Sequence, residues 1–209
     1  RMQYFYTDVQ FQGAYPQYAL NYFAENDIHL EITDEDKQLL KDHPMDYLAL
    51  SYYYSQMVDA SKNTMSPSSV TPNPNLKANP WGWAVDPQGL YNSLSQYWDR
   101  YHKSIIIAEN GFGMYDKLED GKVHDDYRIS YLSEHIAQMK RAMYDGADVI
   151  AYCAWGPIDI ISCSSAQMEK RYGFIYVDLD NEGKGSGQRI KKDSFDWYKQ
   201  VIASNGETL

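Results

Sequence analysis

The sequence has 209 residues, of which 44% are hydrophobic and 23% are charged, as in an ordinary globular protein. The formal net charge of −10 argues against a nucleic-acid partner, because a polyanionic backbone would be repelled. No stretch approaches 18 consecutive apolar residues, so the sequence predicts no helix that crosses a membrane. The 20 tyrosines and 5 tryptophans suit half-wet clefts such as those that bind sugars, although core and interface positions account for most of them.

The two cysteines, Cys153 and Cys163, form neither a CxxC pair nor a disulfide framework. Free thiols in a reducing cytoplasm are the simplest interpretation. No signal peptide is recognisable, so we expect a cytoplasmic location. The five histidines are scattered without metal-ligand spacing, and no metal site is expected.

The first half of the chain is predicted to alternate helix and strand. Residues 17–26 are expected to be helical, and Thr33 is expected to cap a second helix with acidic residues in its first turn. The aromatic-rich stretch Asp46–Ser55 is predicted to be a strand. Four prolines among Ser and Asn residues predict a long loop over residues 59–80.

The second half continues this alternation. Asp86 followed by Pro87 is a typical helix start, and Gly146 is expected to stop a helix whose apolar residues repeat from Asp125 onward. The expected elements are helices at 86–101, 125–145 and 193–203, strands at 104–109 and 148–155, and a small hairpin at 171–180.

Three apolar strands separated by helices predict an α/β fold with a parallel sheet whose strands are buried on both faces. The strands run into polar or aromatic residues: Ser51-Tyr52-Tyr53, Glu109-Asn110 and Trp155. In (β/α)₈ barrels the functional side chains sit at these strand ends. No glycine-rich fingerprint follows any strand, which disfavours a dinucleotide-binding fold. From the residues alone, Glu109 fits a structural salt bridge as well as a functional carboxylate.

The stretch IIIAENG (residues 105–111) resembles the nucleophile strand of glycoside hydrolase family 1, the retaining β-glycosidases. Five more stretches resemble the family, in its order and over about residues 10–203: SYYYS, WGWAVDPQGL, DDYRISYLSEHI, AWGPIDIIS and KRYGFIYVD. The resemblance implies the C-terminal portion of a (β/α)₈ TIM barrel, with residues 1–209 as a single partial domain, the C-terminal half of that barrel. A full barrel has ~250 residues or more.

The resemblance implies roles for three residues. Glu109 would be the catalytic nucleophile that forms a glycosyl-enzyme, and Tyr53 would hydrogen-bond it and keep it ionised. Trp155 would lie against the glycone. The family's acid/base glutamate belongs to an Asn-Glu-Pro motif, whereas the only Asn-Glu pair here, Asn181-Glu182, lies in a glycine-rich turn. We therefore expect the acid/base residue to lie outside this chain.

The loop over residues 162–172 narrows the substrate. Where ordinary family β-glucosidases carry a Glu that binds the sugar 4- and 6-hydroxyls, this chain has Cys163-Ser164, with Lys170 and Tyr172 downstream. The pattern resembles the 6-phospho-β-glucosidase branch, in which Ser, Lys and Tyr hold the phosphate; an ammonium and two hydroxyl donors suit that anion. Ser165 is an alternative to Ser164, and a solvated loop lysine is the structural alternative. The absence of a Trp beside this serine favours gluco- over galactosides.

The resemblance thus implies hydrolysis of a 6-phospho-β-glucoside to glucose 6-phosphate and an aglycone, by a retaining mechanism without metal or cofactor. The expected partner is a phosphorylated β-glucoside, either a disaccharide or an aryl glycoside. Two alternatives stay open. In the first, the chain is a catalytically inert fragment or a sugar-phosphate-binding module. In the second, it associates with a second copy of itself or with a missing N-terminal half through exposed strand edges.

Overall fold

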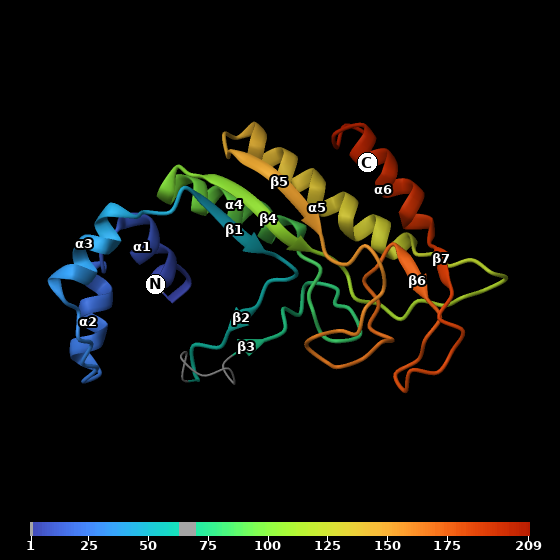
Figure 1. The fold of residues 1–209 in the computed structure, drawn as a ribbon, viewed down its shortest axis with the longest axis horizontal. Helices are drawn as coiled ribbons and strands as arrows, with labels where there is room; N and C mark the ends of the chain where they lie inside the picture. Colours follow the sequence, from blue (N-terminus) through green and yellow to red (C-terminus); the bar gives the residue numbers. More distant parts are fainter. Residues whose placement is uncertain (1, 63–69) are drawn as a thin grey trace.

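The computed structural model describes residues 2–62 and 70–209 (Figure 1). In chain order the elements are η1 (Met2–Tyr4), α1 (Phe5–Gln12), α2 (Gln17–Glu25), α3 (Asp34–Asp42), β1 (Tyr47–Ser51), β2 (Met57–Val58), β3 (Val70–Thr71), α4 (Pro87–Tyr101), β4 (Ser104–Asn110), α5 (Asp126–Tyr144), β5 (Val149–Ala154), β6 (Ile175–Val177), β7 (Arg189–Lys191) and α6 (Asp193–Ala203). Within these two ranges no helix combines the length and the hydropathy needed to span a bilayer.

A three-stranded parallel sheet in the order β1-β4-β5 forms the centre of the molecule. Helix α4 connects β1 to β4, and α5 connects β4 to β5, so each connection is a strand-helix-strand unit. Figure 1 shows α1, α2 and α3 at one end of the sheet, and α6 with the β6-β7 hairpin at the other. The predicted α/β fold with parallel strands is confirmed.

One face of this sheet forms the main core. Leu90 and Leu94, four residues apart on α4, are fully buried against Ile105 and Ile107 of β4. Burial of each such side chain stabilises the fold by about 1.5–3 kcal/mol. The other face is more open: Ala49 of β1 is exposed, and Ile106 of β4, which pairs with it, is only half-buried. The expectation that the strands are buried on both faces is therefore wrong, because the helices that follow β1 and β4 contribute to the same core.

The helix starts follow the predicted caps. The Asp86 side chain accepts a 3.0 Å hydrogen bond from the backbone N–H of Gly89, and Pro87 is the first residue of α4. Thr33 and Asp36 form a reciprocal capping box at the start of α3. Both caps satisfy backbone donors that have no partner within the helix.

Helix α1 was not predicted, because its sequence carries no cap signal and only a weak apolar stripe. Tertiary contacts hold it instead. Its buried Asp8 accepts hydrogen bonds of 2.6 Å from Nε and 2.5 Å from Nη2 of Arg100, which lies on α4. This two-pronged contact ties the N-terminal helices to the helix that covers the sheet.

Two further elements differ from the prediction. The expected hairpin at 171–180 is instead formed by β6 and β7, whose strands pair Ile175 with Lys191 and Val177 with Arg189. The glycine-rich stretch between them is thus the connecting loop, longer than the hairpin signal suggested. In the predicted loop at 59–80, Val70 begins a short strand that pairs antiparallel with β2. Residues 63–69 of that loop lie outside the described residues.

Candidate active site

Glu109 lies near the end of β4, directly after a β-bulge. On the β1 side, Leu50 pairs with Ile107 and the next residue, Ser51, pairs with Glu109. Ala108 is therefore an extra residue in β4. An extra residue shifts the alternation of a strand by one position, so that each following side chain points to the opposite face.

The bulge decides which way the carboxylate points. Ile105 and Ile107 are buried, and an unbroken alternation would bury Glu109 beside them. After the extra residue, Asn110 takes the buried position and Glu109 is only half-buried. The strand thereby keeps an ionisable group out of the apolar core, where an unpaired charge would be costly.

The structure brings Glu109 and Tyr53 together. Tyr53 follows β1, and its hydroxyl donates a 2.7 Å hydrogen bond to Oε2 of Glu109. The backbone N–H of Tyr52 also donates to the carbonyl of Glu109 at 2.8 Å. Burial and the bond to Glu109 raise the pKa of Tyr53 well above its ordinary value, so the hydroxyl stays a donor. A hydrogen bond to an ionised acceptor is worth about 1.5–3 kcal/mol.

Asn110 joins the strand ends from the buried side. Its Nδ2 donates to the carbonyl of Tyr52 at 2.7 Å and to the hydroxyl of Tyr131 at 3.1 Å, and its Oδ1 accepts from Tyr152 at 2.7 Å. The Tyr131 hydroxyl donates onward to the carbonyl of Tyr53 at 2.6 Å. The backbone around Tyr53 is thus fixed by a buried polar network whose members have partners.

Two glycines let aromatic rings close on this strand end. Trp155 follows β5, and its backbone N–H donates to the carbonyl of Asn110 at 2.7 Å. A Cβ on Gly111 would lie 3.1 Å from Cβ of Trp155, and one on Gly113 would lie 2.9 Å from Cζ of Tyr172. A larger residue at Gly113 would therefore displace the Tyr172 ring.

Lys170 and Ser164 are in contact. The Lys170 residue is only 1% exposed, and its Nζ donates a 3.2 Å hydrogen bond to Oγ of Ser164. The Ser164 Oγ in turn lies 3.3 Å from Oγ of Ser162. The Ser165 hydroxyl, the alternative considered from the sequence, is buried and has no hydrogen-bond partner among the described residues. Of these two serines, Ser164 is the one placed beside the ammonium.

Tyr172 connects this group to the nucleophile candidate. Its ring centroid lies 6.3 Å from that of Tyr53, in an edge-on arrangement, and 5.8 Å from Nζ of Lys170. Burial raises the pKa of Tyr172 to about 12 and lowers the pKa of Lys170. The six residues predicted from the sequence therefore lie around the carboxyl ends of the parallel strands. Trp155 is linked to the end of β4 through its contacts with Asn110 and Gly111.

The sequence interpretation missed the two tryptophans that lie against Lys170. Its Nζ is 3.8 Å from the ring centroid of Trp83 and 5.1 Å from that of Trp81. Both belong to the stretch WGWAVDPQGL, which was singled out only as a family-like helix start. A pair of tryptophans just before the predicted helix at 86–101 was the available signal.

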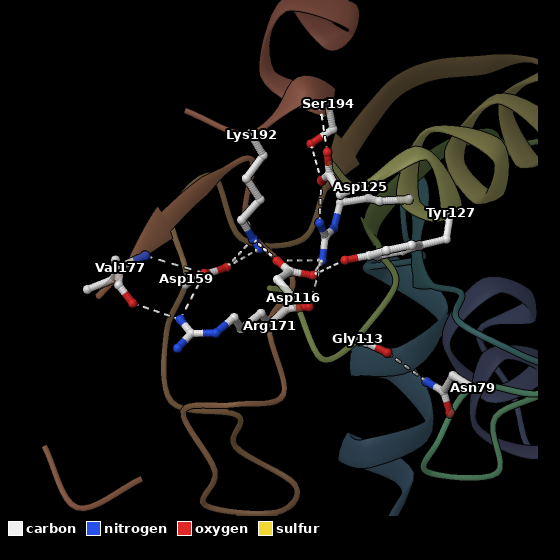
Figure 2. A network of polar contacts seen from close by, with 12 residues as sticks. Asn79, Gly113, Asp116, Asp125, Tyr127, Asp159, Arg171, Val177, Lys192 and Ser194 are labelled. Atoms are coloured by element: carbon white, nitrogen blue, oxygen red, sulfur yellow. Dashed lines mark hydrogen bonds and ion pairs between the residues drawn. The ribbon is translucent and has the colours of Figure 1, made fainter. Parts of the chain in front are cut away.

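A buried ionic network holds the loop that carries Lys170 and Tyr172 (Figure 2). Arg171, which lies between them, forms a 3.1 Å ion pair through Nη1 with Asp159. Its two Nη atoms also donate to the carbonyls of Val177 and Leu179, each at 2.7 Å. Anchoring Arg171 fixes the backbone that carries Lys170 and Tyr172 on either side of it.

The network balances its charges internally. Its carboxylates are Asp116, Asp125 and Asp159, and its cations are Arg128, Arg171 and Lys192. Lys192 pairs with Asp159 at 2.6 Å and also with Asp116. Such complete pairing is what makes burial of several charges tolerable.

No three His, Cys, Asp or Glu side chains within residues 2–62 and 70–209 gather as metal ligands would.

Comparison with known proteins gives related results. The chain is 50% identical over 211 residues to an aryl-phospho-β-D-glucosidase of Bacillus subtilis, covering 98% of this chain and 45% of that protein. A phospho-cellobiase of Klebsiella oxytoca is 49% identical with the same coverage. The structure of a family 1 β-glucosidase of Thermotoga maritima bound to isofagomine lactam superposes with a TM-score of 0.80 at 29% identity, over 97% of this chain and 44% of that one.

The chain therefore spans slightly less than half the length of the relatives it matches. The match to the Thermotoga maritima enzyme is consistent with the strand-helix alternation and with a partial barrel. The sequence profile of glycosyl hydrolase family 1 matches residues 1–207, almost the whole chain. On this match, the chain belongs to glycosyl hydrolase family 1.

Proposed function

We propose that this chain carries the nucleophile and the phosphate-binding side of a 6-phospho-β-glucosidase. The proposed reaction is hydrolysis of a 6-phospho-β-glucoside to glucose 6-phosphate and an aglycone, with retention at the anomeric carbon. The phospho- prefix in the names of both curated relatives supports this substrate class. The observation that carries the proposal is Lys170, a buried ammonium beside Ser164 and Tyr172 with no carboxylate paired to it among the described residues.

In the proposed mechanism, an Oε atom of Glu109 attacks the anomeric carbon as the bond to the aglycone oxygen breaks. A second carboxylic acid protonates that oxygen, and the same group then takes a proton from water as the water oxygen displaces Glu109. Retaining glycosidases hold the two carboxyl groups about 5–5.5 Å apart. No Asn-Glu-Pro sequence occurs in residues 1–209, so the second carboxyl would come from the remaining part of the family barrel.

Tyr53 has two tasks in this proposal. Its hydroxyl holds Oε2 of Glu109 by a hydrogen bond, and it leaves the other carboxylate oxygen free for attack. Trp155 would present its ring to the apolar face of the sugar. The edge contact between Tyr53 and Tyr172 supports a single substrate site, in which the anomeric carbon would lie at Glu109 and the 6-phosphate at Lys170.

The chemistry of the phosphate site follows from what surrounds Lys170. A phosphate near −2 charge accepts hydrogen bonds and is repelled by carboxylates. The described site offers the Lys170 ammonium and the hydroxyls of Ser164 and Tyr172. With a net charge of −10 on the whole chain, attraction of an anion depends on such a local cation.

The test is a mass measurement on the purified, folded chain. A dinitrophenyl 2-deoxy-2-fluoro-β-glucoside 6-phosphate has a leaving group that needs little acid assistance, and its fluorine slows release of the adduct. We expect one sugar phosphate attached at Glu109, and no adduct with the unphosphorylated analogue. The matched controls are Glu109→Gln, which removes the nucleophile, and Lys170→Met, which removes the phosphate partner but keeps the nucleophile.

The outcomes separate the proposal from its alternatives. An adduct that forms on the folded chain, and that requires both Glu109 and Lys170, supports the nucleophile and the phosphate site. Binding of glucose 6-phosphate by calorimetry without any adduct would support a sugar-phosphate-binding module. The absence of both from a folded chain would contradict the proposed activity of this chain and favour an inert fragment.

A further inference from the structure

Lys170 is held by aromatic rings where a buried lysine ordinarily has a carboxylate partner. Its Nζ lies 3.8 Å from the ring centroid of Trp83, 5.1 Å from that of Trp81 and 5.8 Å from that of Tyr172. All three distances fall within the roughly 6 Å over which a cation is attracted to a ring face. The closest of the three rings is that of Trp83.

Trp83 itself is fixed from several sides. Its ring stacks on Tyr54 with centroids 4.7 Å apart and meets Tyr53 edge-on at 5.5 Å. Its backbone N–H donates a 3.0 Å hydrogen bond to Oδ1 of Asn79, and Nδ2 of Asn79 donates to the carbonyl of Gly113 at 3.2 Å, as Figure 2 shows. The indole is thus a fixed surface rather than a side chain that adapts to its neighbour.

An aromatic face differs from a carboxylate in a way that matters for an anion site. A carboxylate would cancel the charge of Lys170 and repel an incoming phosphate. The ring quadrupole attracts the ammonium but carries no net charge, so the local positive potential is retained. The contact is also weaker than a charge-assisted hydrogen bond, so a phosphate oxygen can replace it.

We propose that Trp83 is the positioning residue of the phosphate site: its ring holds the Lys170 ammonium beside Ser164 while the site is empty and yields it to the 6-phosphate when the sugar binds. This inference rests on the proposed function for the identity of the anion. The contact between Trp83 and Lys170 does not depend on which anion binds. The same ring also touches Tyr53, so one side chain contacts both the partner of Glu109 and the phosphate-binding lysine.

The test observes Lys170 directly, by NMR of the full chain labelled with ¹³C at the lysine ε-carbons. The Lys170 signal is identified by its loss in Lys170→Arg. In the wild-type chain we expect it upfield of ordinary lysine signals, because the neighbouring protons lie over the indole. In Trp83→Leu it should move to the ordinary lysine position, and in Trp83→Phe it should move part of the way.

A second lysine supplies the internal control. Nζ of Lys191 lies 4.4 Å from the ring centroid of Phe195, and these two residues belong to β7 and α6, which contain neither Trp83 nor Lys170. Its upfield signal should be unchanged in both Trp83 variants, which shows that they fold. Glucose 6-phosphate should move the wild-type Lys170 signal downfield, and its affinity for Trp83→Leu should be at least several-fold weaker.

The outcomes distinguish this inference from the function on which it rests. An ordinary Lys170 shift in the wild type, or an upfield shift that survives in Trp83→Leu, overturns the role of Trp83 even where glucose 6-phosphate binds. An upfield shift that is lost in Trp83→Leu but does not respond to glucose 6-phosphate overturns the proposal that the ring yields the Lys170 ammonium to the phosphate. It overturns the proposed phosphate site as well. Equal affinity of wild type and Trp83→Leu likewise overturns the positioning role.

Discussion

Lys192 and Lys170 are buried to the same extent, 1% exposed each, but in opposite electrostatic surroundings. Lys192 contacts two carboxylates, Asp116 and Asp159, in a network whose charges balance. Lys170 contacts a serine hydroxyl and three aromatic rings. Burial lowers the pKa of both lysines, but nearby carboxylates oppose this only at Lys192. The compensated lysine is suited to stability, and the uncompensated one to a ligand.

Removal of the compensated lysine should have the largest effect on stability. Lys192→Met leaves Asp116 and Asp159 buried with one cation fewer between them. Breaking a buried pair typically costs about 3–5 kcal/mol, and we expect a loss of that size in the free energy of unfolding. Urea denaturation followed by circular dichroism measures it. A loss below about 1 kcal/mol would contradict the structural role assigned to the network.

His135 shows a third way to bury a basic side chain, in its neutral form. It lies on α5 with its Nε2 buried and unpartnered among the described residues, and burial lowers its pKa to about 4. Between pH 6.5 and 4 the unfolded chain binds a proton that the folded chain does not, so stability falls as the pH falls.

The expected size of this effect is about 3 kcal/mol between pH 7 and 4, from a difference of about 2.5 pKa units. It is measured as the extra loss of unfolding free energy in the wild type relative to His135→Phe, which cannot bind the proton. Parallel pH profiles for the two proteins would show that His135 is protonated in the fold.

Removal of the uncompensated lysine should leave stability intact and weaken binding. Lys170→Met takes away a buried charge that has no carboxylate partner, so the free energy of unfolding should stay within about 1 kcal/mol or rise. Loss of a charge-assisted contact of about 1.5–3 kcal/mol should weaken glucose 6-phosphate binding about 10- to 100-fold by calorimetry. A large loss of stability with unchanged glucose 6-phosphate binding would contradict this prediction, because Lys170 would then act in stability, as Lys192 is expected to do.

The smallest expected effect concerns alkaline pH. Because burial lowers the pKa of Lys170, its ammonium should lose its proton below the ordinary lysine range, and glucose 6-phosphate affinity should fall there. Lys170→Arg keeps its charge, so any remaining affinity should extend to higher pH. Calorimetric titrations from pH 7 to 10 compare the two. Identical pH profiles would exclude Lys170 as the titrating group.

Much of the fold was readable from the sequence, because local signals and tertiary structure agree in its helices. Asp86-Pro87 and Thr33 start helices as expected, and the apolar run Ser104–Ala108 is a strand. The misses depend on distant contacts: α1 is held by Asp8 and Arg100, and β6 pairs with a strand beyond a glycine-rich loop. Single-residue patterns do not encode such partners.

The sequence proposed members for the candidate site but not their physical arrangement. Family-like motifs identified Glu109, Tyr53, Lys170 and Tyr172, whose contacts the structure now describes. The register shift at Ala108 was not predicted, because a bulge appears only when both partner strands are known. The contact of the Trp83 ring with Lys170 was likewise not predicted from the sequence, since 86 intervening residues separate the two in the chain.

The position of Arg171 between Lys170 and Tyr172 has a consequence for the entropy of binding. Its anchors to Asp159, Val177 and Leu179 restrict the backbone from which the two flanking side chains extend. A loop that is already ordered has little freedom left to lose when it meets a ligand, so less of the interaction free energy offsets ordering. The ionic network is therefore set to act on affinity through the backbone, by restricting the segment that carries Lys170 and Tyr172.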